Sequence, residues 1–287
     1  MIQGGDFLLR LITEKFDVDI PFSGKTLREK LNVMRETAAI EGVGLCGAVV
    51  EKCGTTGGVT TLLTISNAPA LFAVMFGKYT GYEFVSETLN LYKHFIQLVP
   101  LHKSPRFELV EKYCSHQNTF LSCIVKSFEL RFHCDETIKV HLDIDGDVKT
   151  QTIPIINEIV KRERTEYFSE IGTSYKVDDV NRNSIYGLVV RCDKTNGTKT
   201  EIAIHRYLQD EFSFPAVIEN FTITSRLFRD GYETYHHGLF SLTFTNHKLI
   251  NDNTEVCTAD TVIGPLRYLV CGNTQATVYN ESTEALL

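Results

Sequence analysis

The sequence DIDGD places Asp143, Asp145 and Asp147 at the spacing of the first half of an EF-hand calcium loop. The twelfth position of such a loop requires an acidic residue, and Pro154 occupies it here. An Asp-Gly turn between two strands accounts for the same letters, because Asp-Gly supplies the positive φ angles of a tight hairpin. We therefore expect a turn at Asp145-Gly146 and no calcium ion.

Other residues that could bind a metal occur as neighbours, but not at the paired spacing of a structural zinc site. They are His236-His237, His133 with Cys134, and Cys114 with His116. The eight cysteines contain no CxxC pair. Charged residues interrupt the apolar N-terminal run, so we predict no signal peptide. We therefore expect a reducing compartment, free buried thiols and no disulfides. The cysteines are Cys46, Cys53, Cys114, Cys123, Cys134, Cys192, Cys257 and Cys271.

Signatures of enzymes are missing from the sequence. GTTGG at 54–58 has no following Lys-Ser or Lys-Thr, so we interpret it as a loop before a strand and not as a phosphate cradle. There is no GxSxG elbow, and a Ser-His-Asp triad cannot be placed from sequence alone. We expect no enzyme and no cofactor.

Composition excludes two classes of partner. The 287 residues are 43% hydrophobic, which is enough for a large core, and the net charge is -7. No overall basic field would attract nucleic acid, and no apolar run of 18 residues would span a membrane.

The clearest structural pattern is SFELRFHCDETIKVHLDIDGD, at 127–147. Alternate residues are apolar and ionisable, which is typical of antiparallel strands with one buried and one wet face. The expected core face comprises Phe128, Leu130, Phe132, Val140, Leu142 and Ile144. The opposite face comprises Glu129, Arg131, His133, Lys139, His141, Asp143 and Asp145.

Similar alternation continues after residue 105 and predicts a mainly β, antiparallel protein of the sandwich or barrel-like type. Asn196-Gly197 marks a second hairpin turn. A buried helix is expected at 67–77, capped by Asn67 and ended by Gly77. A second helix is expected at 153–168, followed by an exposed loop at 173–184.

The first part of the chain differs from the rest. Residues 25–40 have apolar residues at roughly helical spacing and could form a short helix or an arm. We expect one β domain at 51–287 and an N-terminal arm or helical extension at 1–50 that is integrated with it.

The order of three segments resembles the tail tube proteins of long-tailed bacteriophages. They are GVTTLLTISNAPALFAVMFGKYTG, LNLYKHFIQLVPLHKSPRFELVEKY and FLSCIVKSFELRFHCDETIKVHLDIDGD. The shared features are a strand leading into a short buried helix that ends in Gly77, a strand with His94 and Phe95, and a Ser-Phe-Glu-Leu strand at 127–130. The resemblance covers roughly residues 55–150, and neither the N-terminal forty residues nor the C-terminal part carries a matching motif.

The resemblance implies a β-sandwich subunit of a ring, typically a hexamer, whose rings stack into the hollow tail tube through which phage DNA passes. It implies further partners such as a tape measure and a tail terminator, no specific DNA binding and no membrane. The protein would be made in the bacterial cytoplasm and end in the virion tail. The charged face of 127–147 would then line the lumen, and its acidic residues would keep a polyanion from binding along the tube. The wet face of an ordinary sheet would show the same alternation.

We expect the N-terminal segment and residues 153–183 to contact other subunits or rings. Deletion of residues 1–40 is then expected to leave a folded monomer that does not polymerise. Two alternatives remain open. The inner tube of a contractile injection machine shares the same assembly physics, and a monomeric β-barrel binding a small apolar ligand shares the same strand pattern.

Overall fold

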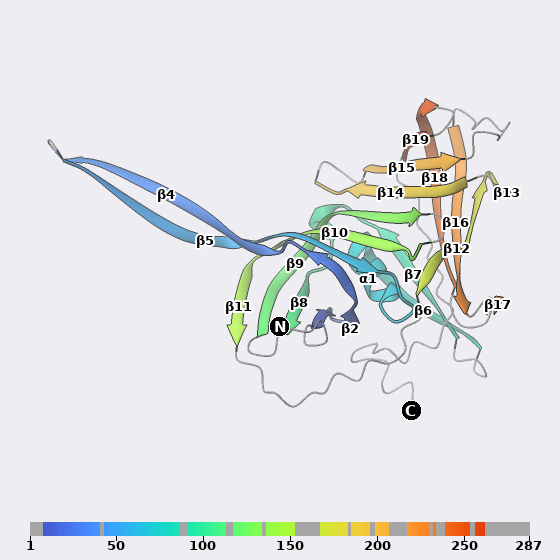
Figure 1. The fold of residues 1–287 in the computed structure, drawn as a ribbon, viewed down its shortest axis with the longest axis horizontal. Helices are drawn as coiled ribbons and strands as arrows, with labels where there is room; N and C mark the ends of the chain where they lie inside the picture. The colour runs from blue at the N-terminus through green and yellow to red at the C-terminus, as the bar shows by residue number, and fades with distance from the viewer. Residues whose placement is uncertain are drawn as a thin grey trace.

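The computed structural model describes residues 8–40, 43–86, 91–112, 117–133, 136–152, 167–182, 185–195, 199–206, 217–229, 232–233, 239–252 and 256–261. Within these residues the chain is mainly antiparallel β structure with one α-helix, as the sequence predicts (Figure 1). That helix, α1 (Ala68–Phe76), has nine residues, and no helix of the described residues is long and apolar enough to cross a membrane.

The smaller of the two main sheets contains the N-terminus of the described chain. Its neighbours pair in the order β2, β1, β8, β9 and β11. These strands are β1 (Leu8–Ile12), β2 (Asp17–Ile20), β8 (Phe107–Lys112), β9 (Gln117–His133) and β11 (Val148–Thr152).

The larger sheet begins where β3 and β4 pair along one side of β5. From β5 the pairing runs through β10, β9, β14, β15, β19, β18, β16, β12 and β13, and the short β17 pairs with β16. The new strands are β3 (Phe22–Lys25), β4 (Arg28–Ile40), β5 (Val43–Leu62), β10 (Lys139–Gly146), β12 (Phe168–Val177), β13 (Val180–Asn181), β14 (Ile185–Asp193), β15 (Lys199–Arg206), β16 (Val217–Arg229), β17 (Tyr232–Glu233), β18 (Leu239–Asp252) and β19 (Val256–Thr261).

Strand β9 belongs to both sheets because its course is interrupted twice. Ser122 has a φ of 53°, and the register with β10 shifts at Lys126, as expected of β-bulges that bend a strand. Up to Cys123, β9 pairs with β8 and β11; from Ile124 it pairs with β10, and from Ser127 with β14 as well.

The larger sheet folds back toward its beginning. Phe168, at the start of β12, donates its N–H to the carbonyl of Leu63 and accepts from the N–H of Ile138. Isolated bridges join Thr64 to Tyr167 and Thr137 to Ser169 nearby.

Helix α1 fills the space inside the folded sheets, and every one of its residues is buried. Phe76 packs edge-on against Phe128 with ring centroids 5.1 Å apart, and Phe72 lies 5.5 Å from Phe240. Gly77 ends the helix at a φ of 102°, as the sequence predicts. Asn67 precedes the helix but does not cap it with its side chain, which instead accepts from the Thr64 N–H and donates to the Leu62 carbonyl.

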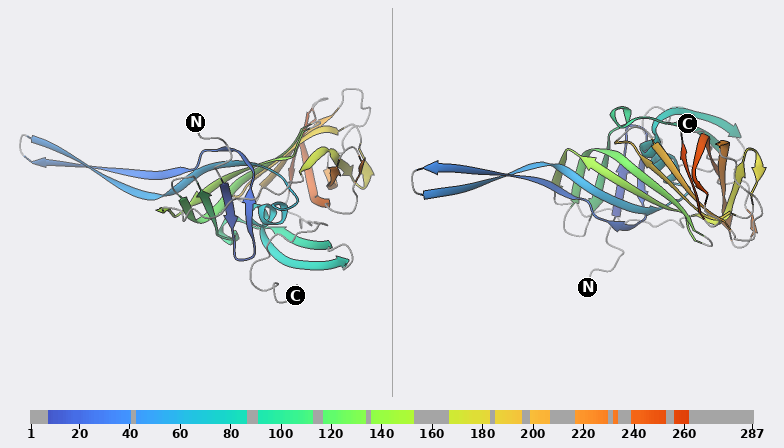
Figure 2. Two further views of the ribbon diagram at one scale, coloured as in Figure 1. Left: turned by 60° about the horizontal axis from the view of Figure 1, so that its bottom comes forward. Right: turned by 90° about the horizontal axis from the view of Figure 1, so that it is seen from above.

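Two antiparallel ribbons extend from this body. β4 and β5 form a long hairpin that projects from one end, and β6 (Gly77–Ser86) and β7 (Leu91–Leu98) form a two-stranded sheet near the other end (Figures 1 and 2). A short 3-10 turn at Leu101–Lys103 follows β7.

The helical interpretation of residues 25–40 is therefore wrong, because 28–40 form strand β4. The partner segment of β5 explains the difference, since each residue from Leu31 to Ile40 has a cross-strand neighbour there. Such pairing overrides a weak helical preference.

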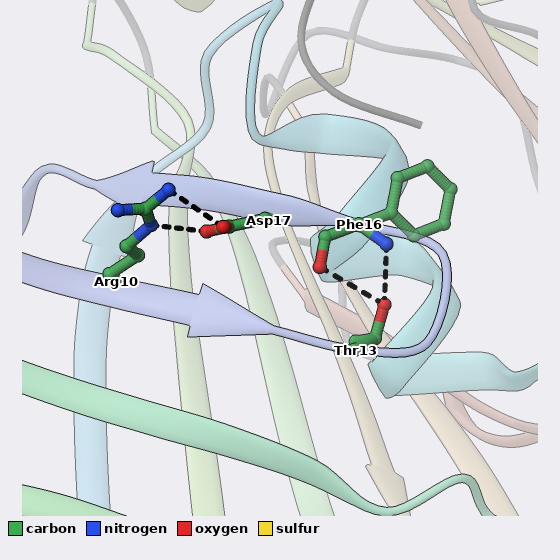
Figure 3. A network of polar contacts seen from close by, with 4 residues as sticks. All are labelled: Arg10, Thr13, Phe16 and Asp17. Atoms are coloured by element: carbon green, nitrogen blue, oxygen red, sulfur yellow. Dashed lines mark hydrogen bonds and ion pairs between the residues drawn. The ribbon is translucent and has the colours of Figure 1, made fainter. Parts of the chain in front are cut away.

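The N-terminal residues before this hairpin are part of the core. Leu9, Leu11 and Val18 are buried, and the β1–β2 hairpin is fixed by the Arg10–Asp17 ion pair and by Thr13, whose hydroxyl accepts from the Phe16 N–H (Figure 3). Deleting residues 1–40 would remove this core, so a folded monomer is no longer the expected result of that deletion.

Three expected loops or turns are strands instead. GTTGG at 54–58 lies inside β5, and residues 173–177 lie inside β12. Asp145-Gly146 is not a hairpin turn, because β10 and β11 run on in the same direction along β9 in one register, with Asp145 opposite Ile124 and Val148 opposite Leu121.

Gly57 explains why a glycine-rich sequence forms a strand here. Its φ is 140°, and a Cβ at this position would stand 2.4 Å from the carbonyl oxygen of Thr26. Glycine therefore allows the segment that enters β4 to cross close to β5.

Two further predictions lie wholly or partly outside the described residues. They include the turn Asn196-Gly197, although β14 and β15 on either side of it do pair as a hairpin. Of the expected helix at 153–168, only Tyr167 and Phe168 are described, and Phe168 begins β12.

Candidate functional site: the charged face of β10, β9 and β14

The ionisable residues of the 127–147 pattern lie across the middle of the larger sheet. In the register, Glu129 of β9 is flanked by His141 of β10 on one side and by Arg191 of β14 on the other. The next row places Arg131 beside Lys139. We call this surface the charged face; it comprises Lys126, Glu129, Arg131, His133, Lys139, His141, Asp143, Asp145, Arg191 and Asp193.

Glu129 is the central anion of the charged face. Its side chain is 14% exposed, and its two carboxylate oxygens accept from Arg131 Nε and, at 2.7 Å, from Arg191 Nε. Partial burial alone would raise the pKa of Glu129, but the hydrogen bonds from the two arginines outweigh burial and hold the pKa below its ordinary value. Glu129 is therefore held ionised between two half-exposed guanidinium groups.

Lys126 supplies a second group of paired charges. The bulge at this residue lets its ammonium nitrogen lie 3.2 Å from Asp145 Oδ1 and 3.6 Å from Asp143 Oδ2. The two carboxylates of the DIDGD sequence thus share one lysine. Asp147 faces elsewhere and pairs with Arg106 at 2.9 Å.

His141 is held by the neighbouring strand. Its Nδ1 lies 2.9 Å from the hydroxyl oxygen of Thr60 on β5. The ring covers Gly58, where an added Cβ would stand 2.7 Å from His141 Cε1. A side chain at position 58 would therefore displace this histidine.

The edges of the charged face are more open to solvent. His133 and Arg131 are exposed, and Lys139 pairs with Glu136 at 2.7 Å. Asp193 accepts from the Thr195 hydroxyl and N–H, and these hydrogen bonds lower the pKa of Asp193.

The opposite face of the same strands is apolar and buried. Its six residues are Phe128, Leu130, Phe132, Val140, Leu142 and Ile144, none more than 2% exposed. Because the two faces differ so completely, a shift of one residue in register would bury the charges, and the register is therefore strongly specified.

Sequence reasoning missed three members of the charged face: Lys126, Arg191 and Asp193. Arg191 is 62 residues from Glu129 in the sequence, so only the topology shows that it lies opposite Glu129. Asp193 lies two residues farther along the same strand. Lys126 breaks the alternation and reaches the face through its bulge. Arg131 and Lys139 lie opposite each other across the strands, and they bind Glu129 and Glu136, respectively.

The chemistry available on the charged face is that of paired ions. Four cations, Lys126, Arg131, Lys139 and Arg191, lie among the carboxylates of Glu129, Glu136, Asp143, Asp145 and Asp193. Opposite charges held together in this way give a weak net field, so the face would not hold a polyanion tightly.

Groups that bind metals or form disulfides are not gathered on this face. In the described part of the chain, no three His, Cys, Asp or Glu side chains are close enough together to hold a metal ion. Cys123 and Cys192 are free and buried, and burial raises the pKa of Cys123 to about 12. Cys114, His116, Cys134, His236, His237 and Cys271 lie outside the described residues.

A buried cation lies beside the charged face. Lys194, just after β14, is 2% exposed, and its ammonium nitrogen donates to the Ser104 hydroxyl at 3.1 Å. Its own N–H donates to the carbonyl of Lys126, so this lysine connects the bulge of β9 to the turn after β7. Burial lowers the pKa of Lys194 to about 8.

Comparison with known proteins identifies no family: no family model matches the chain, and no curated protein matches its sequence.

Proposed function

We propose that this chain is a structural subunit that assembles into rings, with the rings stacked into a hollow tube that conducts DNA, as in the tail tube of a long-tailed phage. The observation that carries the proposal is the β4–β5 hairpin. From Leu31 and Cys53 outward it pairs with no other described strand. At about 3.4 Å per residue the ten paired positions from Leu31 to Ile40 reach about 30 Å beyond the body.

An isolated two-stranded ribbon is at best marginally stable in water. The outer half also has few charges: from Thr37 to Val50 the only ionisable side chain besides Cys46 is Glu41. A projecting, apolar ribbon would promote aggregation of a monomer. In an assembly a neighbouring subunit would cover the ribbon and be held by it.

The charged face is consistent with the wall of a conduit. Each phosphate that a lysine or arginine neutralises adds affinity, and contacts repeated along a tube would retain the DNA. Here Glu129 pairs with Arg131 and Arg191, while Asp143 and Asp145 pair with Lys126, so the three carboxylates balance the three cations. A lumen lined in this way would let DNA pass without specific binding.

A barrel that binds a small ligand is less well supported. Such a barrel needs an open interior, whereas the interior here is filled by α1, whose Phe72 and Phe76 pack on the aromatic residues of the sheets. The inner tube of a contractile injection machine requires the same assembly and remains within the proposal.

The test is to remove the hairpin without touching the core. Lys30 and Gly54 face each other in the register, so a two-residue Asn-Gly turn can join them in place of 31–53. We expect the full chain to show a light-scattering mass that rises with concentration, and the shortened chain to keep the mass of one folded chain. If the shortened chain still forms tubes, the hairpin is not the assembly element.

A further inference from the structure

A group of three polar side chains is buried between the two sheets, apart from the charged face. Glu111 of β8 and Asn118 of β9 lie directly opposite each other in the smaller sheet, and they are 1% and 6% exposed. Lys25, the last residue of β3 in the larger sheet, contacts Glu111, and its side chain is 13% exposed. Three strands therefore bring an amine, a carboxyl group and a carboxamide together in the interior.

Glu111 connects the other two side chains. Its Oε1 forms an ion pair with Lys25 Nζ, and its Oε2 accepts a hydrogen bond of 2.9 Å from Asn118 Nδ2. Asn118 Oδ1 is also buried, and no described residue donates a hydrogen bond to it. The amine nitrogen of Lys25 and the amide nitrogen of Asn118 thus contact the two oxygens of one carboxyl group.

The surroundings of Lys25 favour the neutral amine over the ammonium ion. Its Nζ lies 5.2 Å from the centroid of the Phe120 ring, and Phe120 is 1% exposed. Burial, together with the charge of Lys149, lowers the pKa of Lys25 to about 8. Transfer of one proton from Lys25 to its partner Glu111 gives a neutral amine and a neutral carboxyl group, and a desolvated neutral lysine is a good nucleophile.

We propose that Lys25 and Asn118 join in an isopeptide bond, with Glu111 as the group that carries the proton. Lys25 Nζ attacks Cγ of Asn118, a bond forms between these two atoms, and the bond from Cγ to Nδ2 breaks. The Glu111 carboxyl group receives one proton from Nζ at one oxygen and delivers one to Nδ2 from the other, so that neutral ammonia leaves. The reaction needs no oxidant, reductant or cofactor.

The fold supplies the proximity that this reaction needs. Groups held side by side by a rigid scaffold react as if at a very high concentration. Lys25 is fixed because β3 pairs with β5, and the neighbouring Thr26 exchanges two hydrogen bonds of 2.9 Å with Gly58. Glu111 and Asn118 are fixed by the pairing of β8 with β9. An ordinary buried ion pair would leave all three side chains unmodified, so the covalent composition of the purified chain distinguishes the two.

The bond ties one sheet to the other, because it joins β3 to β9. β3 is followed directly by β4, the first strand of the long hairpin, so the bond also fixes the segment that leads into the hairpin. This inference concerns the single chain. It goes beyond the proposed function and does not depend on assembly.

The experiment is mass spectrometry of the denatured full chain after incubation at neutral pH. We expect a mass about 17 Da below that of the 32.5 kDa sequence, because one ammonia is lost when the amide nitrogen leaves. A tryptic digest should contain a branched peptide that joins the segments around Lys25 and Asn118. Trypsin should not cleave after Lys25, because the acylated side chain has lost its charge.

Three variants remove one participant each: Lys25→Met, Glu111→Gln and Asn118→Leu. Each is expected to keep the full mass of its sequence. Glu111→Asp, which keeps a carboxyl group but withdraws it by one methylene, guards against misfolding of Glu111→Gln and should form the bond more slowly than the parent. Lys112→Met and Gln117→Ala alter neighbouring residues of the same two strands and should lose ammonia as the parent does. Thermal melts verify that each variant is folded.

Three results would overturn the inference. The first is a parent chain that keeps the full mass of its sequence. The second is a loss of ammonia carried by a linear peptide, such as a succinimide at Asn196-Gly197, in place of a branched one. The third is a branched peptide that forms equally fast in Glu111→Gln, because Glu111 would then not carry the proton. All three are read from denatured chains, so they are independent of whether the protein forms tubes.

Discussion

Replacing Lys194 by methionine should remove a marked pH dependence of stability. Lys194 is almost fully buried, with one hydrogen bond to Ser104, and its pKa falls from 10.5 to about 8 because burial disfavours the charged form. The unfolded chain keeps the ordinary pKa of a lysine, so between pH 8 and pH 10.5 it binds a proton that the native protein does not. Stability therefore rises with pH across this window and is lost again as the pH falls through 8.

The size of the effect follows from the shift of the pKa. A difference of about 2.5 pH units corresponds to about 3 kcal/mol at the extremes, and about 2 kcal/mol of it is gained between pH 7 and pH 9.5. Methionine has a similar length and no charge, so Lys194→Met lacks this gain. Burial also lowers the pKa of Lys25 to about 8, and that contribution is common to both proteins.

Urea unfolding at pH 7, 8 and 9.5 measures the difference between the two proteins. We expect the free energy of unfolding of the parent to rise by about 2 kcal/mol more than that of Lys194→Met over this range. Lys103→Met, at an exposed position, serves as the control and should follow the parent. Parallel curves for the parent and Lys194→Met would refute the burial of a titrating lysine at this site.

Three further predictions concern the core and the charged face. Phe76→Ala should lower the free energy of unfolding by about 3–5 kcal/mol, because it opens a cavity between α1 and Phe128; calorimetry showing a loss below 1 kcal/mol would contradict that packing. Gly57→Ala should lower the free energy of unfolding, measured by chemical denaturation, by more than about 1 kcal/mol, because alanine disfavours a φ of 140° and its Cβ would meet the Thr26 carbonyl oxygen. An unchanged denaturation midpoint would show that the segment entering β4 does not cross close to Gly57. Glu129→Gln should lower the free energy of unfolding by about 1 kcal/mol at neutral pH. This difference should shrink as the pH falls below the ordinary pKa of a glutamate, because the lowered pKa of Glu129 gives stability that is present above the ordinary pKa and lost as the pH falls through the native one; a difference that changes with neither pH nor salt would contradict the ion pairs.

The sequence predicts well those features that local alternation determines. The apolar residues at alternate positions from Phe128 to Phe132 and from Val140 to Ile144 lie in the core, because strand periodicity is a strong signal when one face is buried. Helix α1 was predictable from its apolar run and from Gly77, which adopts the left-handed conformation that ends it.

Features that depend on distant pairing were not predictable from a single segment. Residues 28–40 look helical until the complementary strand from Val43 onward is placed beside them. The Asp-Gly sequence at 145 suggests a hairpin, but β9 offers a continuous partner on both sides of it, and the chain runs straight on. Arg191 joins Glu129 only through the order of strands in the sheet.

The central claim is that this chain assembles into a hollow conduit. Negative-stain electron microscopy of the purified protein, over a range of concentrations, tests it most directly. We predict rings with a central opening and, at high concentration, tubes of stacked rings. Particles of single-chain size at every concentration would contradict the claim.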